Sequence, residues 1–222
     1  TTLSCHLLVD ASESMAFRSG RWSKFDYARW CAAALAHLVI GARDTAGLVL
    51  FDDRERVKVP PASGAPQEAA ILGALERASP TGPTGVGAVL KWLGGRLRRR
   101  GIVVVFSDFF DDIESVAEGL RALVHGGHEP IVVQVIDPLE LSFDLTQLAR
   151  FDGLENAGQL KVDPRSIRAA YLEELARHNQ QLARVASGMG IDWIQMNTAD
   201  SLEPALSSYL AHRSARSRGG RI

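Results

Sequence analysis

The sequence has little cysteine and no long apolar run, and each shortage excludes a class of protein. Cys5 and Cys31 are the only cysteines among 222 residues, and both lie in apolar segments. Such thiols are typical of buried free cysteines in a reducing compartment, not of a disulfide-stapled secreted domain. No apolar run approaches the roughly 18 to 20 residues that a membrane-spanning helix needs. The sequence also shows no signal peptide.

Acidic and basic residues almost cancel, because 25 Lys and Arg stand against 26 Asp and Glu and give a formal net charge of −1. A chain without excess positive charge has no general attraction to nucleic acid, so we expect no nucleic-acid partner. The 46% hydrophobic and 23% charged residues are ordinary for a globular protein. We expect one domain over residues 1–212, located in the cytoplasm, and a basic, disordered tail over residues 213–222.

The sequence starts without Met, and an apolar run of strand length follows almost at once. We therefore expect this chain to be the C-terminal part of a longer protein. That expectation leaves open a membrane tether in upstream sequence, which would hold the domain at the cytoplasmic face.

Strand-length apolar runs alternate with helix-length amphipathic segments. The predicted strands are Leu3–Val9, Gly47–Phe51, Arg56–Val59, Ile102–Phe106, Pro130–Ile136 and Asp192–Met196, and the predicted helices are Phe25–Ile40, Pro66–Arg77, Val86–Arg99, Ile113–Val124, Pro164–Gly188 and Leu202–His212. This alternation predicts an α/β fold with three layers, in which a doubly wound, mostly parallel sheet is flanked by helices. Residues 139–162 interrupt the rhythm, and we expect a turn at residues 155–158 between short extended pieces that leave the sheet edge.

An acid-and-hydroxyl loop directly follows the first predicted strand. Asp10, Ser12 and Ser14 form a D-x-S-x-S pattern there. Hard oxygen ligands at the carboxyl end of a parallel strand suit an ion of the size of magnesium. The alternative is turn chemistry, in which these side chains bond nearby backbone amides and hold no metal.

Two other loops offer matching groups. Asp108 follows the β-branched run Ile102–Phe106, which is typical of a strand buried on both faces of a parallel sheet. Thr84 lies in the Gly- and Pro-rich loop of residues 80–85, just before a predicted helix. Two carboxylates and three hydroxyls from three loops would leave one coordination position for an outside ligand. The predicted metal ligands are Asp10, Ser12, Ser14, Thr84 and Asp108.

At these residues the chain resembles the von Willebrand factor A fold and its metal-ion-dependent adhesion site (MIDAS). That site combines D-x-S-x-S with a Thr on a second loop and an Asp on a third. The resemblance implies that the hydroxyls of Ser12, Ser14 and Thr84 contact Mg²⁺ while Asp10 and Asp108 act largely through water. Mn²⁺ and Ca²⁺ are the alternatives to Mg²⁺. A carboxylate from a partner protein would complete the coordination.

The chain is still more similar to a bacterial subgroup, the "domain of unknown function 58" family. The residues that carry this likeness include Ser23-Lys24-Phe25-Asp26-Tyr27-Ala28, residues 98–108, Gly127-His128-Glu129 and Val135-Ile136-Asp137-Pro138. The likeness covers the chain from about Leu3 to His212. The likeness implies that the protein acts as an adaptor or substrate-presenting partner of a MoxR-type AAA+ ATPase.

We therefore predict a non-enzymatic protein-binding domain whose metal ion accepts an acidic side chain of a partner. One alternative is a metal-dependent phosphohydrolase, but Ser12 stands where an aspartyl-phosphate enzyme needs a second Asp, and the sequence has no Walker-type loop. The other alternative is a metal-free structural scaffold.

Two details of the predicted site depart from the usual pattern or stay open. Many such sites have an acid or Asn after the loop Thr, where this chain has Gly85. Thr81 on the same loop is an alternative ligand, although its spacing to the following helix is less favourable than that of Thr84.

A run of arginines, residues 96–100, invites a nucleic-acid interpretation. We prefer a structural one, in which the cations complement the dipole at the end of a helix that Gly101 caps. Asp111 and Asp112 precede a predicted helix, and we expect them to cap it at its N-terminus.

Overall fold

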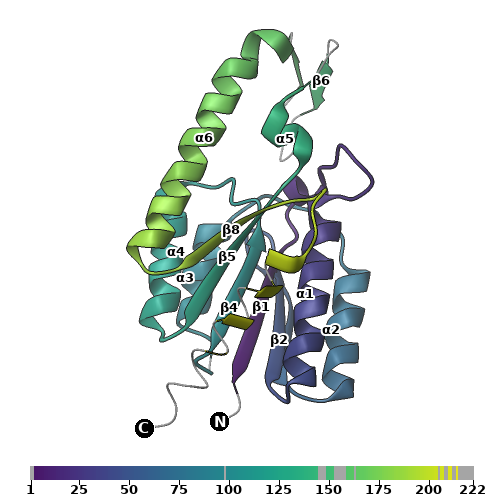
Figure 1. Cartoon of the computed structure of the whole chain (residues 1–222), viewed down its shortest axis with the longest axis vertical. Helices are drawn as coiled ribbons and strands as arrows, with labels where there is room; N and C mark the ends of the chain where they lie inside the picture. Colours follow the sequence, from purple (N-terminus) through teal and green to yellow (C-terminus); the bar gives the residue numbers. More distant parts are fainter. Residues whose placement is uncertain are drawn as a thin grey trace.

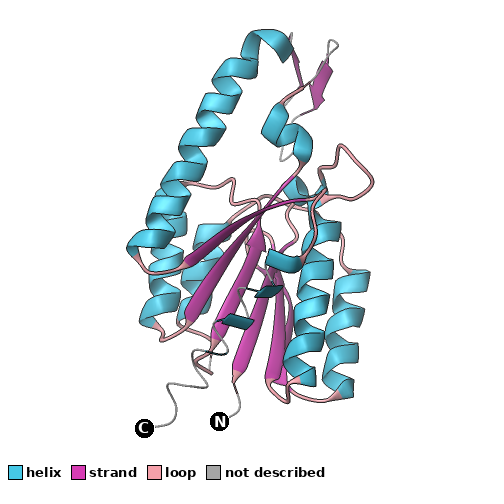
Figure 2. Ribbon diagram, in the orientation of Figure 1, coloured by secondary structure: helices cyan, strands magenta, loops and turns pink. Residues whose placement is uncertain are grey.

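One six-stranded sheet forms the centre of the computed structural model, which describes residues 3–97, 99–144, 149–152, 159–162, 164–204, 206–207, 210–211 and 214. The strand order is β3-β2-β1-β4-β5-β8 (Figures 1 and 2). The strands are β1 (Ser4–Asp10), β2 (Thr45–Phe51), β3 (Glu55–Ala62), β4 (Ile102–Ser107), β5 (Glu129–Ile136) and β8 (Asp192–Asn197). Edge strand β3 is antiparallel to β2, and the other neighbouring pairs are parallel.

Helices cover both faces of this sheet (Figure 1). On one side lie α1 (Lys24–Gly41) and α2 (Ala65–Arg77); on the other lie α3 (Val86–Gly94), α4 (Ile113–His125) and α6 (Pro164–Gly188). Each face has its own apolar core, with Leu7 of β1 packed towards α1 and its neighbour Leu8 packed towards α4. The predicted α/β fold with three layers is confirmed.

The central strands are apolar throughout because both of their faces are covered. Every residue of β1 and β4 is buried, and successive side chains enter opposite cores. Val9 of β1 pairs with Phe106 of β4, so these two strands end side by side. The chain passes from β1 to β2 on one side and later returns to β4 on the other. This reversal of strand order lies at β1 and β4, and in open α/β sheets ligands bind at the carboxyl ends of the strands beside such a reversal.

Helix α3 ends earlier than predicted. It ends at Gly94, with Gly95 as its C-cap, and not at Arg99. A Cβ atom at Gly94 would lie 2.7 Å from the backbone carbon of Ala122 in α4, so the glycine is needed for close packing. The arginine run therefore follows the helix, and our explanation that Gly101 caps a helix ending in arginines is wrong.

Strand β3 is longer than predicted. It continues through Pro60 and Pro61 to Ala62 instead of ending at the prolines. Prolines are tolerated here because β3 is an edge strand with one unpaired side. A Cβ atom on Gly47 of β2 would lie 2.9 Å from the Pro61 ring, so the glycine makes room for it.

The expected excursion between β5 and α6 contains a helix that we did not predict, α5 (Pro138–Ser142). Asp137 caps it, and Glu140 returns a bond to the Asp137 backbone N–H, so Asp137-Pro138-Leu139-Glu140 is a capping box with Pro at N1. Strands β6 (Ala149–Asp152) and β7 (Gln159–Val162) then form a separate antiparallel pair. The short extended pieces are confirmed, and the expected turn at residues 155–158 lies outside the described residues.

Only parts of the C-terminal region are described. Backbone at residues 203–204, 206–207 and 210–211 is helical, in agreement with the helix predicted from Leu202. Leu202 itself lies in a bend, so the helix begins one residue later than predicted; residues 205, 208–209 and 212 and the predicted tail, apart from residue 214, lie outside the described residues. Within the described part of the chain, no helix has both the length and the apolar character needed to cross a membrane.

Candidate metal centre

The five predicted ligands come from three loops at the carboxyl end of the sheet. Asp10 is the last residue of β1, and Ser12 and Ser14 lie in the turn that follows. Asp108 directly follows β4, and Thr84 lies between α2 and α3. Since β1 and β4 are parallel neighbours, their loops leave the sheet at the same edge.

The three hydroxyl groups lie close together. Ser12 Oγ is 3.2 Å from Ser14 Oγ and 3.2 Å from Thr84 Oγ1. In an octahedral magnesium site with bonds of about 2.1 Å, neighbouring ligand oxygens lie ~3 Å apart. The hydroxyl spacing therefore fits the ion. Thr81 makes a different contact, in which its backbone N–H donates to the Ala11 carbonyl at 2.9 Å.

Asp10 has the environment of a fully buried carboxylate. Its Oδ1 accepts a bond from the Ser12 backbone N–H at 2.8 Å, and its Oδ2 accepts one from Ser107 Oγ at 2.6 Å. Burial and the nearby carboxylate of Asp108 raise the pKa of Asp10 to about 7, against the effect of these bonds. A cation at the site would offset the cost of this buried charge. The backbone bond is also the one that the turn interpretation of D-x-S-x-S predicts.

Lys24 was missed as a member of the site. Its Nζ donates to Asp108 Oδ2 at 2.8 Å and to Glu140 Oε1 at 2.7 Å, and its side chain is 1% exposed. Burial alone would lower the pKa of Lys24, but the carboxylates of Asp108 and Glu140 outweigh it and raise the pKa. One signal was available in the sequence, because a cation in the first turn of a helix opposes the helix dipole and needs a separate reason.

The loop that carries Asp108 is held in an unusual backbone conformation. Phe109 is fully buried and has a φ of 57°, in the left-handed region that non-glycine residues rarely adopt. Its N–H donates to Ser107 Oγ at 2.9 Å, and its carbonyl lies 2.8 Å from His178 Nε2. Because a carbonyl only accepts, Nε2 is the donor. Gln134 Nε2 donates to the Asp108 carbonyl at 3.1 Å, so two more side chains position this loop.

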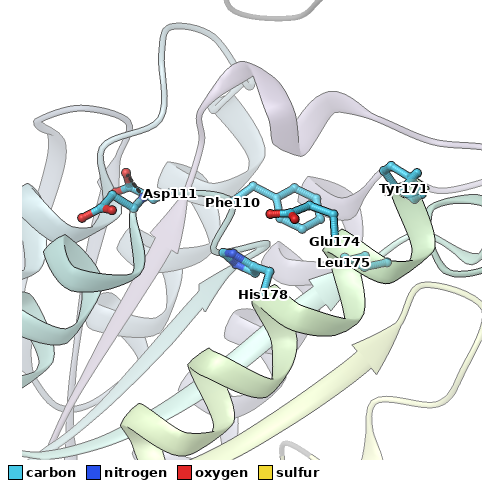
Figure 3. A pocket seen from close by; sticks show the side chains of 7 residues that line it. Phe110, Asp111, Tyr171, Glu174, Leu175 and His178 are labelled. Atoms are coloured by element: carbon cyan, nitrogen blue, oxygen red, sulfur yellow. Dashed lines mark hydrogen bonds between the residues drawn. The ribbon is translucent and has the colours of Figure 1, made fainter. Parts of the chain in front are cut away.

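The position of His178 could not be found by local sequence reasoning. It lies on α6, 69 residues beyond Phe109, with no metal-ligand or catalytic spacing around it. The α6 helix also lines a cavity of about 510 Å³ beside the Asp108 loop, in which Phe110 faces the side chains of Glu174 and His178 (Figure 3). At its edge Asp112 accepts a bond from the Ser115 N–H at 2.8 Å, which confirms Asp112 as an N-cap of α4. Asp111, which we expected to share that role, instead accepts a bond from the Gly87 N–H of α3 at 3.0 Å.

Gly85 has a packing role beside Thr84. A Cβ atom at this position would lie 2.8 Å from the Cα of Asp53, which is a backbone atom and cannot rotate away. The acid or Asn of the usual pattern therefore does not fit here without a shift of the loop at Asp53.

The donor set decides what the site could hold. Two carboxylates and three hydroxyls are hard oxygen donors, which suit Mg²⁺ better than softer metals. In the described part of the chain, no group of three or more His, Cys, Asp or Glu residues could hold a metal ion. A cation at this edge would therefore depend on the hydroxyl oxygens as much as on the two aspartates.

Solved structures support the fold. BatB, a conserved hypothetical protein from Bacteroides thetaiotaomicron, superposes with a TM-score of 0.66 at 16% identity, over 96% of this chain and 99% of the other. An aerotolerance-related membrane protein from Bacteroides fragilis superposes with a TM-score of 0.62 at 15% identity, over 93% of this chain and 96% of the other. At these identities the likeness is one of fold.

Sequence comparison gives relatives in the genus Mycobacterium. An uncharacterized protein of Mycobacterium tuberculosis is 27% identical over 198 residues, which are 86% of this chain. The aligned region spans 61% of that relative's length. The model of the family described as "protein of unknown function DUF58" matches residues 1–181. The likeness to that family, inferred above from motifs, is thereby confirmed, and the chain belongs to the DUF58 family.

Proposed function

We propose that this chain is a non-enzymatic protein-binding domain that holds Mg²⁺ through Asp10, Ser12, Ser14, Thr84 and Asp108. The observation that carries the proposal is the spacing of the three hydroxyls. Ser12 Oγ lies 3.2 Å from both Ser14 Oγ and Thr84 Oγ1, beside two carboxylates where the strand order reverses between β1 and β4. When bound, the ion supplies an open coordination position. A carboxylate of a partner protein would fill that position, so metal occupancy would control association.

The partner that we propose is a MoxR-type AAA+ ATPase, which follows from the family resemblance. The aligned region spans 61% of the length of the mycobacterial relative, so the partners of the whole protein are part of this proposal. Binding of the purified ATPase to this domain, measured with Mg²⁺ and with a chelator, tests the pairing. Equal binding under both conditions would contradict a metal-dependent contact.

A metal-free scaffold is the second candidate, and one observation favours it. Asp108 already has a cation partner, because the buried ammonium of Lys24 lies 2.8 Å from its Oδ2. A carboxylate that is neutralised within the chain has less need of an ion. The metal-dependent phosphohydrolase has no comparable support, and hydrolysis of p-nitrophenyl phosphate with Mg²⁺ would be the result that revives it.

Two threonines on one loop allow a matched test of the metal site. We expect Thr84→Val, which keeps the shape of the side chain and removes its hydroxyl, to weaken Mg²⁺ and Mn²⁺ binding at least about tenfold in calorimetric titration, since it deletes one ligand. Thr81→Val is the control, because Thr81 is exposed and contributes a backbone contact. Binding that is equally strong in the parent and both variants would place the ion elsewhere. No binding by the parent would leave the scaffold as the function.

A further inference from the structure

Lys24 joins the candidate metal centre to an element outside it. Its ammonium lies between Asp108 on the β4–α4 loop and Glu140 on α5, 2.8 Å and 2.7 Å away. The exposed fractions of the three side chains are 1%, 0% and 13%, so water does little to screen this cluster. In such surroundings the position of one charge strongly affects the others.

Helix α5 is held at its start by the same region. The other oxygen of Glu140, Oε2, accepts a bond from the Asp137 N–H at 2.9 Å. Asp137 accepts bonds from both the backbone N–H and the hydroxyl of Ser19, which lies on the loop between β1 and α1. The contacts of Lys24 and Ser19 thus fix α5 above the carboxyl end of the sheet (Figure 1).

We propose that Lys24 regulates the metal centre by dividing its charge between Asp108 and Glu140, so that metal occupancy and the docking of α5 depend on each other. This inference rests on the proposed function. A divalent ion near Asp108 repels the ammonium and takes part of that carboxylate's charge, which shifts Lys24 towards Glu140 and tightens α5. In the opposite direction, when Glu140 is removed, Asp108 becomes the remaining carboxylate partner of Lys24 in this cluster. The ammonium then interacts more strongly with Asp108, which disfavours binding of the ion there. Linkage requires that the ion favour docking of α5 by the same factor by which docking of α5 favours the ion.

The net charge of the site predicts opposite changes of metal affinity for two single variants. Asp10 in its ionised form, Asp108, Glu140 and protonated Lys24 together carry two negative charges, which match one divalent cation. Glu140→Gln reduces the negative charge, whereas Lys24→Met increases it. The double variant Lys24→Met with Glu140→Gln restores the original total.

The test is a calorimetric titration of the parent chain and these three variants with MgCl₂ and with MnCl₂. We expect Glu140→Gln to weaken binding about fivefold or more, Lys24→Met to strengthen it by a similar factor, and the double variant to return to within about twofold of the parent. Glu118→Gln is the control, since it removes one carboxylate from an exposed ion pair with Lys91. It should leave the affinity within about twofold of the parent.

A second measurement reads α5 directly. Hydrogen exchange of the amides in residues 139–142 should slow in the parent when Mg²⁺ is added and stay unchanged in Lys24→Met. If Lys24→Met fails to fold because it leaves buried carboxylates without a counter-ion, Glu140→Gln decides the question alone.

The outcomes separate the two ideas. Metal binding by the parent with an unchanged affinity in Glu140→Gln overturns the coupling and leaves the proposed function standing. No metal binding by the parent overturns both.

Discussion

The buried carboxyl group of Asp10 makes the free energy of unfolding of this domain depend on pH. Its carboxylate is buried at the carboxyl end of the central strand β1, and burial together with Asp108 raises its pKa to about 7. In an unfolded chain an Asp titrates near 4, so the folded state holds this proton over a wider range of pH. The free energy of unfolding therefore falls as pH rises from about 4 to about 7, because in this range the unfolded chain releases the proton that the folded state still holds.

We expect Asp10→Asn to remove this pH dependence. In the presence of a chelator, its stability relative to the parent should increase between pH 5 and pH 8 by on the order of a few kcal/mol. Urea unfolding of both proteins at the two pH values measures the difference. An Asn variant that loses as much stability as the parent over this range would contradict the argument.

At the same scale, the sequence placed two of the predicted ligands at strand ends but did not reveal the side chains that contact their loops. Asp10 and Asp108 could be predicted because the apolar runs before them, β-branched in the case of Asp108, mark strand ends. The contacts of Lys24 and His178 could not be predicted, because they depend on how α1 and α6 pack over those ends. Residue type and spacing in the sequence therefore indicate which residues end a strand. Contacts between distant elements are known only from the folded structure.

Among the elements, α3 and α4 pack unusually closely because glycines face the contact. A Cβ atom on Gly87 would lie 2.4 Å from the backbone carbon of Ser115, and one on Gly119 would lie 2.6 Å from the Gly87 carbonyl. Neither neighbour is a flexible side chain, so the helices would have to separate. The position of α3 also fixes the loop that carries Thr84.

We expect Gly87→Ala to lower the free energy of unfolding by about 1–3 kcal/mol, since overpacking outweighs the better helix propensity of Ala. Gly95→Ala is the matched control, because a Cβ atom there meets nothing within 4 Å and the backbone conformation is ordinary. Thermal unfolding of both variants measures the effect. Equal stability of the two would mean that the helices separate without cost.

The errors in the predicted elements have physical causes. The end of α3 was placed at Arg99 because helix formers follow Gly95, whereas the pair Gly94-Gly95 has low helix propensity and Gly95 is the C-cap. Helix α5 was missed inside a segment without apolar periodicity, although its capping box is visible in the sequence. Local signals of this kind outweigh periodicity when a helix has only five residues.

In the whole molecule, the carboxyl end of the sheet lies against helices from both layers, so a ligand there should stabilise the complete fold. An ion that binds only the folded state adds about 2.7 kcal/mol when its concentration is 100 times Kd. We expect Mg²⁺ or Mn²⁺ at such concentrations to raise Tm by several degrees. A chelator should reverse the shift, and Thr84→Val should lack it.

The prediction of the overall architecture succeeded because strand and helix segments alternate along nearly the whole chain, which leaves few topologies open. The antiparallel direction of β3 follows from the short connection after β2, since a parallel return needs a dozen or more residues.

Pro60 and Pro61 on β3 have one more consequence. An open sheet ends in a row of backbone donors and acceptors, and such a row can recruit a strand from another molecule. The two prolines lack N–H groups, so the outer border of this sheet is interrupted where they lie. The protein is thereby protected at this border against edge-to-edge aggregation when many copies are crowded together.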